Sequence, residues 1–149
     1  MLIDPSALKD IGHAIQLALA PAFLLTAIAG TLNVMTGRLA RIIDRGREVM
    51  EGTTSERSDE DVAKEVRGLE RRRHLASVAI TATTFSALLV CMVVATLFID
   101  VLFAINLNLL VGVLFAGSSL ALVVGLAFFL REVQLATMTV RIRSPRPGR

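Results

Sequence analysis

Tryptophan and tyrosine are absent from this chain of 149 residues, and it has a single cysteine, Cys91. One cysteine excludes a small secreted scaffold held by disulfides, which needs cysteines in pairs. The missing Trp and Tyr remove the aromatic belt that usually marks the two faces of a membrane. The ends of any membrane-spanning segment must therefore be placed from the charged residues.

Charge is missing from two long stretches of the chain. No charged residue lies between Ile11 and Thr36, and Asp100 is the only one between Leu75 and Leu130. Of the 29 charged side chains, 19 lie between Arg38 and Arg73. Together with 54% hydrophobic residues and a mean hydropathy of +0.65, this pattern indicates a membrane protein and argues against a soluble enzyme domain or a disordered chain.

The two uncharged stretches predict three membrane-spanning helices. A spanning helix needs about 20 apolar residues, so residues 11–36 supply one. The second stretch is long enough for two, and it is interrupted by Asp100, Asn106 and Asn108. The predicted segments are an N-terminus outside the cytoplasm at 1–10, spans at 11–36, 75–99 and 107–130, an outer loop at 100–106, a polar connector at 37–74 and a tail at 131–149.

Lys and Arg in short loops mark the cytoplasmic side of a membrane protein. The connector carries ten of them and the tail five, whereas the N-terminus has only Lys9 and the loop at Asp100 has none. We therefore predict an outside N-terminus and a cytoplasmic C-terminus, with the end of the tail disordered because it contains two prolines. The net charge of +3 reports this orientation, so we expect contact with membrane lipids and no nucleic-acid partner.

The polar connector is predicted to be a helical hairpin. Apolar residues recur at a helical period in both of its halves, and opposite charges lie three or four residues apart, as in Arg45 and Glu48. Helices at 38–51 and 59–73, with a helix start at Ser58, have nearly equal length. The predicted fold is therefore an all-α integral membrane protein whose first and second transmembrane helices extend into a cytoplasmic antiparallel hairpin. The alternative is a solvated charged linker.

The first span has a polar face, which in lipid requires contact with protein or water. One interpretation is packing against the other two spans. The other is a pore surrounded by the first spans of several copies, because three helices cannot enclose a conduit alone. The pore-lining candidates are Gln16, Thr26, Gly30, Asn33 and Gly37, and the charges at the inner mouth are Arg38, Arg41, Asp44 and Arg45.

The third span carries small residues at a spacing of four, which lets helices approach closely in a membrane. This pattern predicts a helix-packing face. Its residues are Gly117, Ala121 and Gly125.

The sequence shows no catalytic or metal-binding arrangement. His13 and His74 fall near opposite membrane boundaries, so they cannot share a metal or act as one catalytic pair. Cys91 lies in an apolar stretch, where a thiol behaves as a small hydrophobe, and no base stands near Ser118 or Ser119. No Asp, Glu, Lys or Arg lies inside a predicted span, which argues against an ion-coupled transporter. We expect no enzymatic activity, no metal and no cofactor.

Two segments resemble a bacterial family of small membrane proteins known only as a domain of unknown function. They are Gln16–Leu25 (QLALAPAFLL) and Leu32–Arg45 (LNVMTGRLARIIDR), and the arginines before the second span and the segment Leu130–Val133 are similar to it as well. The resemblance covers roughly residues 16–133. It implies an integral protein of the bacterial inner membrane with the topology given above, and it implies no established activity.

Two functions are compatible with these features. The first is passive permeation of small ions through a homo-oligomeric pore lined by the first span, which makes further copies of the chain its partners. The alternative is a non-conducting membrane scaffold or regulatory subunit whose cytoplasmic hairpin binds a partner protein or anionic lipid. The two hypotheses differ in whether the polar face of the first span contacts water.

Overall fold

The computed structural model describes residues 5–51 and 59–140, and within them the chain is all-α, without a strand. Each helix contains a stretch long and apolar enough to cross a membrane, so the prediction of an all-α fold with three such helices is confirmed, and this supports a multi-pass membrane protein. The helix start at Ser58 and the disordered end of the tail lie outside the described residues. The three helices are α1 (Pro5–Met50), α2 (Asp59–Phe103) and α3 (Asn108–Val140).

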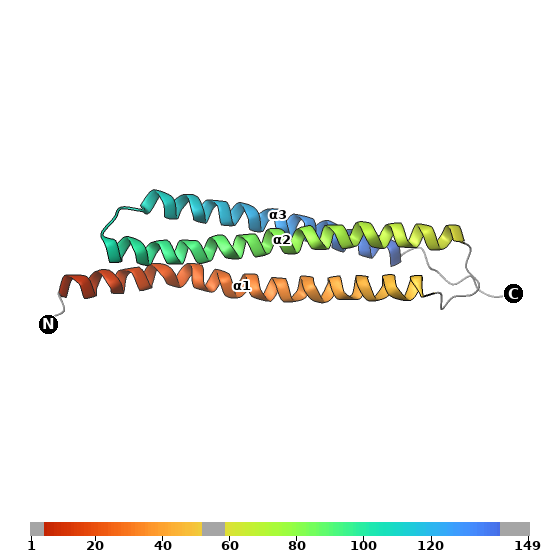
Figure 1. The fold of residues 1–149 in the computed structure, drawn as a ribbon, viewed down its shortest axis with the longest axis horizontal. Helices are drawn as coiled ribbons and strands as arrows, with labels where there is room; N and C mark the ends of the chain where they lie inside the picture. Colours follow the sequence, from red (N-terminus) through yellow and green to blue (C-terminus); the bar gives the residue numbers. More distant parts are fainter. Residues whose placement is uncertain (1–4, 52–58, 141–149) are drawn as a thin grey trace.

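α2 is the central helix of the three. It runs antiparallel to α1, which lies beside it, and to α3, which begins on the side of α2 away from α1 and crosses behind α2 (Figure 1). The turn between α2 and α3 lies at the same end as the start of α1 (Figure 1). α1 and α3 have little direct contact. The first helix is therefore an outer helix of a layer, and one of its sides is free of the rest of the chain.

α1 packs on α2 through an apolar stripe with a strict seven-residue repeat. Such a repeat keeps one side of a helix against a neighbour when the two wind around each other with a left-handed twist. Pro21 belongs to this stripe and lies inside an uninterrupted helix. The buried residues are Ala14, Pro21, Ile28, Met35 and Ile42, with Ala18 beside them.

α2 buries residues at spacings of three and four between Ala76 and Thr96, which is the pattern of a helix that keeps one side against its neighbours. Three of them are hydroxyl residues whose donors are satisfied. Thr83 donates to the Ala79 carbonyl (2.8 Å), and Ser86 donates across the interface to the Ser118 carbonyl of α3 (2.7 Å). The buried set is Ala76, Ala79, Thr83, Ser86, Val90, Val93 and Thr96.

α3 packs against α2 through Ser118, Gly125 and Glu132, which also recur every seven residues and are buried. Gly125 marks the closest approach of the two helices. A β-carbon built on it would lie 3.1 Å from the Ala79 carbonyl oxygen and 3.1 Å from the Thr83 amide nitrogen. A glycine is therefore required at this crossing, because any side chain would meet the backbone of α2.

The turn between α2 and α3 is built by the polar residues that interrupt the second uncharged stretch. The Leu107 amide donates to Asp100 Oδ1 (2.7 Å), and Asn106 Oδ1 accepts a longer bond from the Asn108 amide (3.4 Å). Ala104 has a φ of 50°, a left-handed conformation that reverses the chain. α2 continues to Phe103, so the turn is shorter than the predicted loop at 100–106.

Candidate functional site

The three helices meet at one carboxylate. Glu132 on α3 is fully buried, and it accepts hydrogen bonds from Arg38 on α1 and Arg72 on α2. Arg38 donates to Oε2 from Nε (3.0 Å), and its Nη2 forms an ion pair with the same oxygen (3.0 Å). Arg72 donates to Oε1 from Nε (3.2 Å) and Nη2 (3.0 Å). Each carboxylate oxygen thus lies against two nitrogens of one guanidinium, and hydrogen bonds between two charged groups are shorter and stronger than those between neutral groups.

This cluster lies where the apolar parts of the helices end. Arg38 is the second residue after Thr36, the last of the first uncharged stretch, and Glu132 is the second after Leu130. The Arg38 guanidinium also lies over the ring of Phe129, 5.8 Å from its centroid, on the turn of α3 that precedes Glu132. Arg38, Arg72 and Glu132 therefore tie α1 and α3 together through α2 at one level of the bundle.

A second ion pair links α1 and α2 farther from the apolar segments. Arg45 donates to Glu65 Oε1 from Nη2 (2.9 Å) and Nε (3.2 Å), and to Glu48 Oε2 from Nη1 (3.0 Å). The hydrogen bonds to Glu65 and then to Glu48 raise the pKa of Arg45, so its guanidinium stays charged. These bonds show that the polar parts of α1 and α2 pair side by side.

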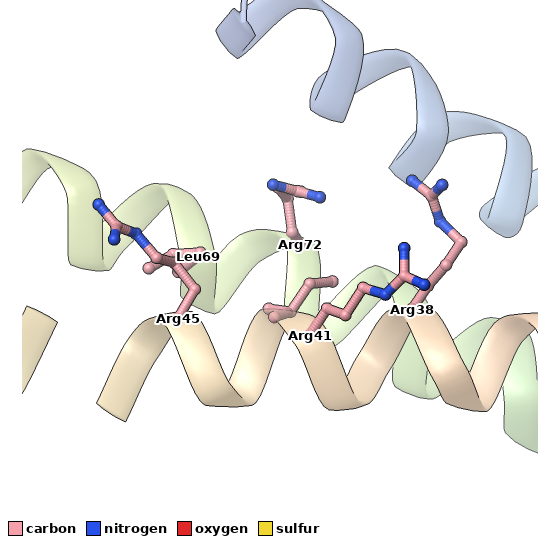
Figure 2. A pocket seen from close by; sticks show the side chains of 6 residues that line it. Arg38, Arg41, Arg45, Leu69 and Arg72 are labelled. Carbon is pink, nitrogen blue, oxygen red and sulfur yellow. The ribbon is translucent and has the colours of Figure 1, made fainter. Parts of the chain in front are cut away.

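Between these two ion-pair clusters lies a hollow lined by four arginines. Arg38, Arg41 and Arg45 rise from α1, and Arg72 faces them from α2 (Figure 2). Ile42 and Leu69 complete the lining, and the volume is about 290 Å³. No carboxylate lines this hollow, since Glu132 and Glu65 are engaged behind it. It is an open, cationic site between two helices.

The structure brings together three of the four residues predicted at the inner mouth. Arg38, Arg41 and Arg45 lie on one side of α1 and line the hollow, whereas Asp44 is exposed and does not line it. Their spacing of three and four residues places them on successive turns of the same helical face. These charges therefore face α2 and α3 within one copy of the chain.

The predicted pore-lining residues lie on the opposite side of α1. Asn33 and Gly37 are each two residues from the buried Met35, a rotation of about 200° around the helix. The interpretation that this face packs against the other two spans is wrong within one copy, because the apolar stripe of α1 makes that contact instead. The exposed residues are Gln16, Thr26, Gly30, Asn33 and Gly37.

The small residues predicted to pack on the third span lie on the side of α3 that faces α2. Gly125 makes the close approach described above. A β-carbon at Gly117 would lie 3.6 Å from Leu89 Cδ1, an ordinary contact, and Ala121 is half-buried. Of the two glycines in this set, only Gly125 lies so close to α2 that a side chain would not fit.

Glu132 and Arg72 are the site residues that the sequence reasoning missed. Glu132 stands beside Arg131 at the start of a basic tail, where an acidic residue is easily taken for a solvated one. A usable signal was present, because Arg38, Arg72 and Glu132 each lie within three residues of the end of an uncharged stretch. Residues at equal distances from span ends share one depth in the membrane and can meet there.

The described residues contain no group of three His, Cys, Asp or Glu side chains that could hold a metal ion. Cys91 is exposed on the surface of α2 and is not enclosed by the protein. The chemistry available at the cluster is therefore ionic: guanidinium groups, one buried carboxylate and an open hollow between them.

Comparison with known proteins assigns a family. A family model described as "Protein of unknown function (DUF2721)" matches residues 18–142, which is most of the chain. The chain belongs to this family, in agreement with the resemblance carried by the first span and the segment after it. No curated protein and no solved structure matches it.

Proposed function

We propose that the protein assembles as a homo-oligomer in the bacterial inner membrane and lets small ions permeate passively through a pore lined by α1. The observation that carries this proposal is the exposed polar face of α1, which lies opposite the stripe that packs on α2. In this assembly the N-terminus is outside, and the hairpin of α1 and α2 is cytoplasmic, following the distribution of Lys and Arg.

The position of α1 in the layer supports a central role in an oligomer. α1 lies beside α2, and α3 begins on the side of α2 away from α1, so the free side of α1 can face a rotation axis while the outer side of α3 faces lipid (Figure 1). Among the described residues, no atom of another helix lies within 4 Å of a β-carbon built on Gly30 or Gly37, which leaves space on that side. Ring-like assemblies of one chain normally close around such an axis.

The polar side chains on this face of α1 differ in whether their hydrogen-bonding groups have partners within the helix. The Thr26 hydroxyl donates to the Ala22 carbonyl (3.3 Å), so it is satisfied within the helix. The side-chain amide of Asn33 makes no hydrogen bond with the described residues. An amide facing hydrocarbon would cost several kcal/mol. Water or a second copy of α1 removes that cost, which favours a hydrated or protein-covered environment around Asn33.

Leu19 and Phe23 lie on the same side of α1, between Gln16 and Thr26, and are 51% and 72% exposed. In a pore lined by α1 they form an apolar ring between polar ones. Apolar constrictions regulate ion flow by excluding water when they narrow. The proposed conduit thus has a wetted inner part at Asn33 and a barrier toward the outer part at Phe23.

Thiol accessibility tests the pore. In a Cys91→Ala background, cysteine at Thr26 or Asn33 is expected to react with a small charged thiol reagent, because a thiolate forms only in contact with water. Cysteine at Leu120, which is 68% exposed on α3, serves as the lipid-facing control and should not react. In liposomes, Asn33→Leu is expected to lower ion flux at least severalfold. Unreactive thiols at both positions, together with no flux from the purified protein, would contradict the pore.

The second candidate, a non-conducting scaffold or regulatory subunit, is favoured by a different observation. Ile43 and Met50 are 44% and 73% exposed, seven residues apart on the charged part of α1, beyond the uncharged stretch. Paired apolar side chains on a polar surface are typical of a protein contact. Replacing both with serine is expected to abolish recovery of a bound partner while the membrane assembly stays intact. An unchanged set of bound proteins would count against this candidate.

A further inference from the structure

We propose that the hollow lined by Arg38, Arg41, Arg45 and Arg72 binds a phosphate group, carried by an anionic lipid headgroup or by a small soluble phosphate compound. This inference does not depend on whether α1 lines a pore. Guanidinium groups bind phosphate with paired N–H donors, and several arginines around one space are the usual protein arrangement for this anion.

The charges around the hollow do not cancel. Its four guanidinium groups are bonded by three carboxylates, those of Glu48, Glu65 and Glu132. The net surplus is one positive charge: Arg45 pairs with two carboxylates, whereas Arg38 and Arg72 share one. Arg41 makes no hydrogen bond or ion pair with the described residues. A site with one surplus positive charge matches a singly charged anion such as a phosphodiester.

The arginines also keep free donors. A guanidinium has five N–H groups, and both Arg38 and Arg72 bind Glu132 through Nε and Nη2 alone. Their Nη1 groups have no bond to the carboxylate. Glu132 thus fixes these two side chains in place without using up their donors, so a ligand finds them already oriented.

The size and floor of the hollow suit a headgroup. Its volume of about 290 Å³ corresponds to roughly ten water molecules at ~30 Å³ each. Ile42 and Leu69 give it an apolar floor between the basic side chains, which can receive the carbon atoms next to a phosphate. A lone chloride ion would leave most of this space filled with water.

The depth of the hollow matches that of lipid phosphates. Arg41 lies five residues after Thr36, which is about 7 Å along a helix. The headgroup layer on each side of the hydrocarbon core is about 5–8 Å thick. Basic pockets between helices at this level bind anionic headgroups. The lipid is therefore the source that reaches the site directly, and a soluble phosphate compound would enter from the aqueous side.

Native mass spectrometry of the full chain tests the site, with phosphatidylglycerol, phosphatidylcholine and inorganic phosphate as separate probes. We expect phosphatidylglycerol to bind in preference to phosphatidylcholine, and Arg41→Gln to weaken this binding about tenfold. Arg41→Lys, which keeps the charge and loses the planar fork, should fall between the native protein and Arg41→Gln. Arg47→Gln is the matched control, since Arg47 is exposed on the same helix and does not line the hollow.

The outcomes separate the two sources. Binding of phosphatidylglycerol that depends on Arg41 supports a lipid site, and binding of inorganic phosphate alone that depends on Arg41 supports a soluble ligand. Equal losses in Arg41→Gln and Arg47→Gln would show general attraction to a basic surface and would overturn the proposal, as would a native protein that binds neither probe. Because the Arg41 side chain is exposed and unbonded, its variants should fold with an unchanged melting temperature, which is measured alongside.

Discussion

Glu132→Ala is expected to destabilise the protein by about 3–5 kcal/mol, the loss typical of removing one member of a buried ion pair. The Glu132 side chain is fully buried, and its two oxygens are the acceptors that bring Arg38 and Arg72 together. Without the carboxylate, two guanidinium groups from different helices face each other across a partly buried space. α1 and α3 then lose the main bond between them, because they have little other contact.

The measurement is the free energy of unfolding in mixed micelles as the fraction of denaturing detergent rises. Glu48→Gln is the control, since Glu48 is 65% exposed and bonds the same type of partner, so it should cost less than about 1 kcal/mol. In a double-mutant cycle, Arg72→Ala should cost much less once Glu132 is already absent. Additive losses would mean that Glu132 does not act through Arg72. A Glu132→Ala loss no larger than that of Glu48→Gln would contradict the role of this carboxylate.

The number and approximate limits of the spans could be predicted because charge is excluded from hydrocarbon at a large energetic cost. The same argument could not show how the spans meet. Among the hydroxyl residues of α2, Ser77 and Thr81 are exposed, whereas Thr83 and Ser86 are buried. In lipid a hydroxyl that bonds a helix carbonyl is tolerated on either side, so polarity alone does not identify the packed face.

The helical pattern of charges in the connector allowed helices to be predicted there. Charges at a spacing of three or four predicted helices on both sides of Gly52, and α1 ends at Met50 while α2 begins at Asp59. The bond between Arg45 and Glu65, which are 20 residues apart in the chain, could not be predicted because it depends on the register of α1 against α2. Glu132 was missed for the same reason, since its partners lie 94 and 60 residues away.

The seven-residue repeat is the signal that could have placed the packed faces. Ile28, Met35 and Ile42 on α1 recur at the same interval as Ser118 and Gly125 on α3. A repeat of seven predicts helices that wind around each other, whatever the polarity of its members. Small and apolar residues are common everywhere in a membrane span, so this repeat is hidden until the close contact at Gly125 shows which of them face a neighbour.

Gly125→Val is expected to cost about 3 kcal/mol, near the upper end of the usual penalty for overpacking a close contact. The reason is that the atoms in the way are mostly backbone. A β-carbon at this position meets Thr83 Oγ1, the Thr83 amide nitrogen and the Ala79 carbonyl oxygen, and the last two cannot rotate aside. α3 must then move away from α2, and this weakens the hydrogen bond from Ser86 to the carbonyl of Ser118, which lies about two helical turns from Gly125. Gly125→Ala should cost less, about 1–2 kcal/mol.

Unfolding in mixed micelles measures this loss, and Gly112→Ala is its control. Gly112 lies on the same helix with no atom near a β-carbon, so its substitution should change stability by less than about 0.5 kcal/mol. Adding Thr83→Ala to Gly125→Ala removes the hydroxyl from the contact and leaves the backbone, so it should recover part of the loss and not all of it. Full recovery of the unfolding free energy would mean that the clash at Gly125 involves the Thr83 hydroxyl alone. If Gly112→Ala and Gly125→Ala lower the free energy of unfolding equally, the cost comes from replacing a glycine in α3 and not from the close approach of two helices. The crossing at Gly125 would then not be what holds α3 against α2.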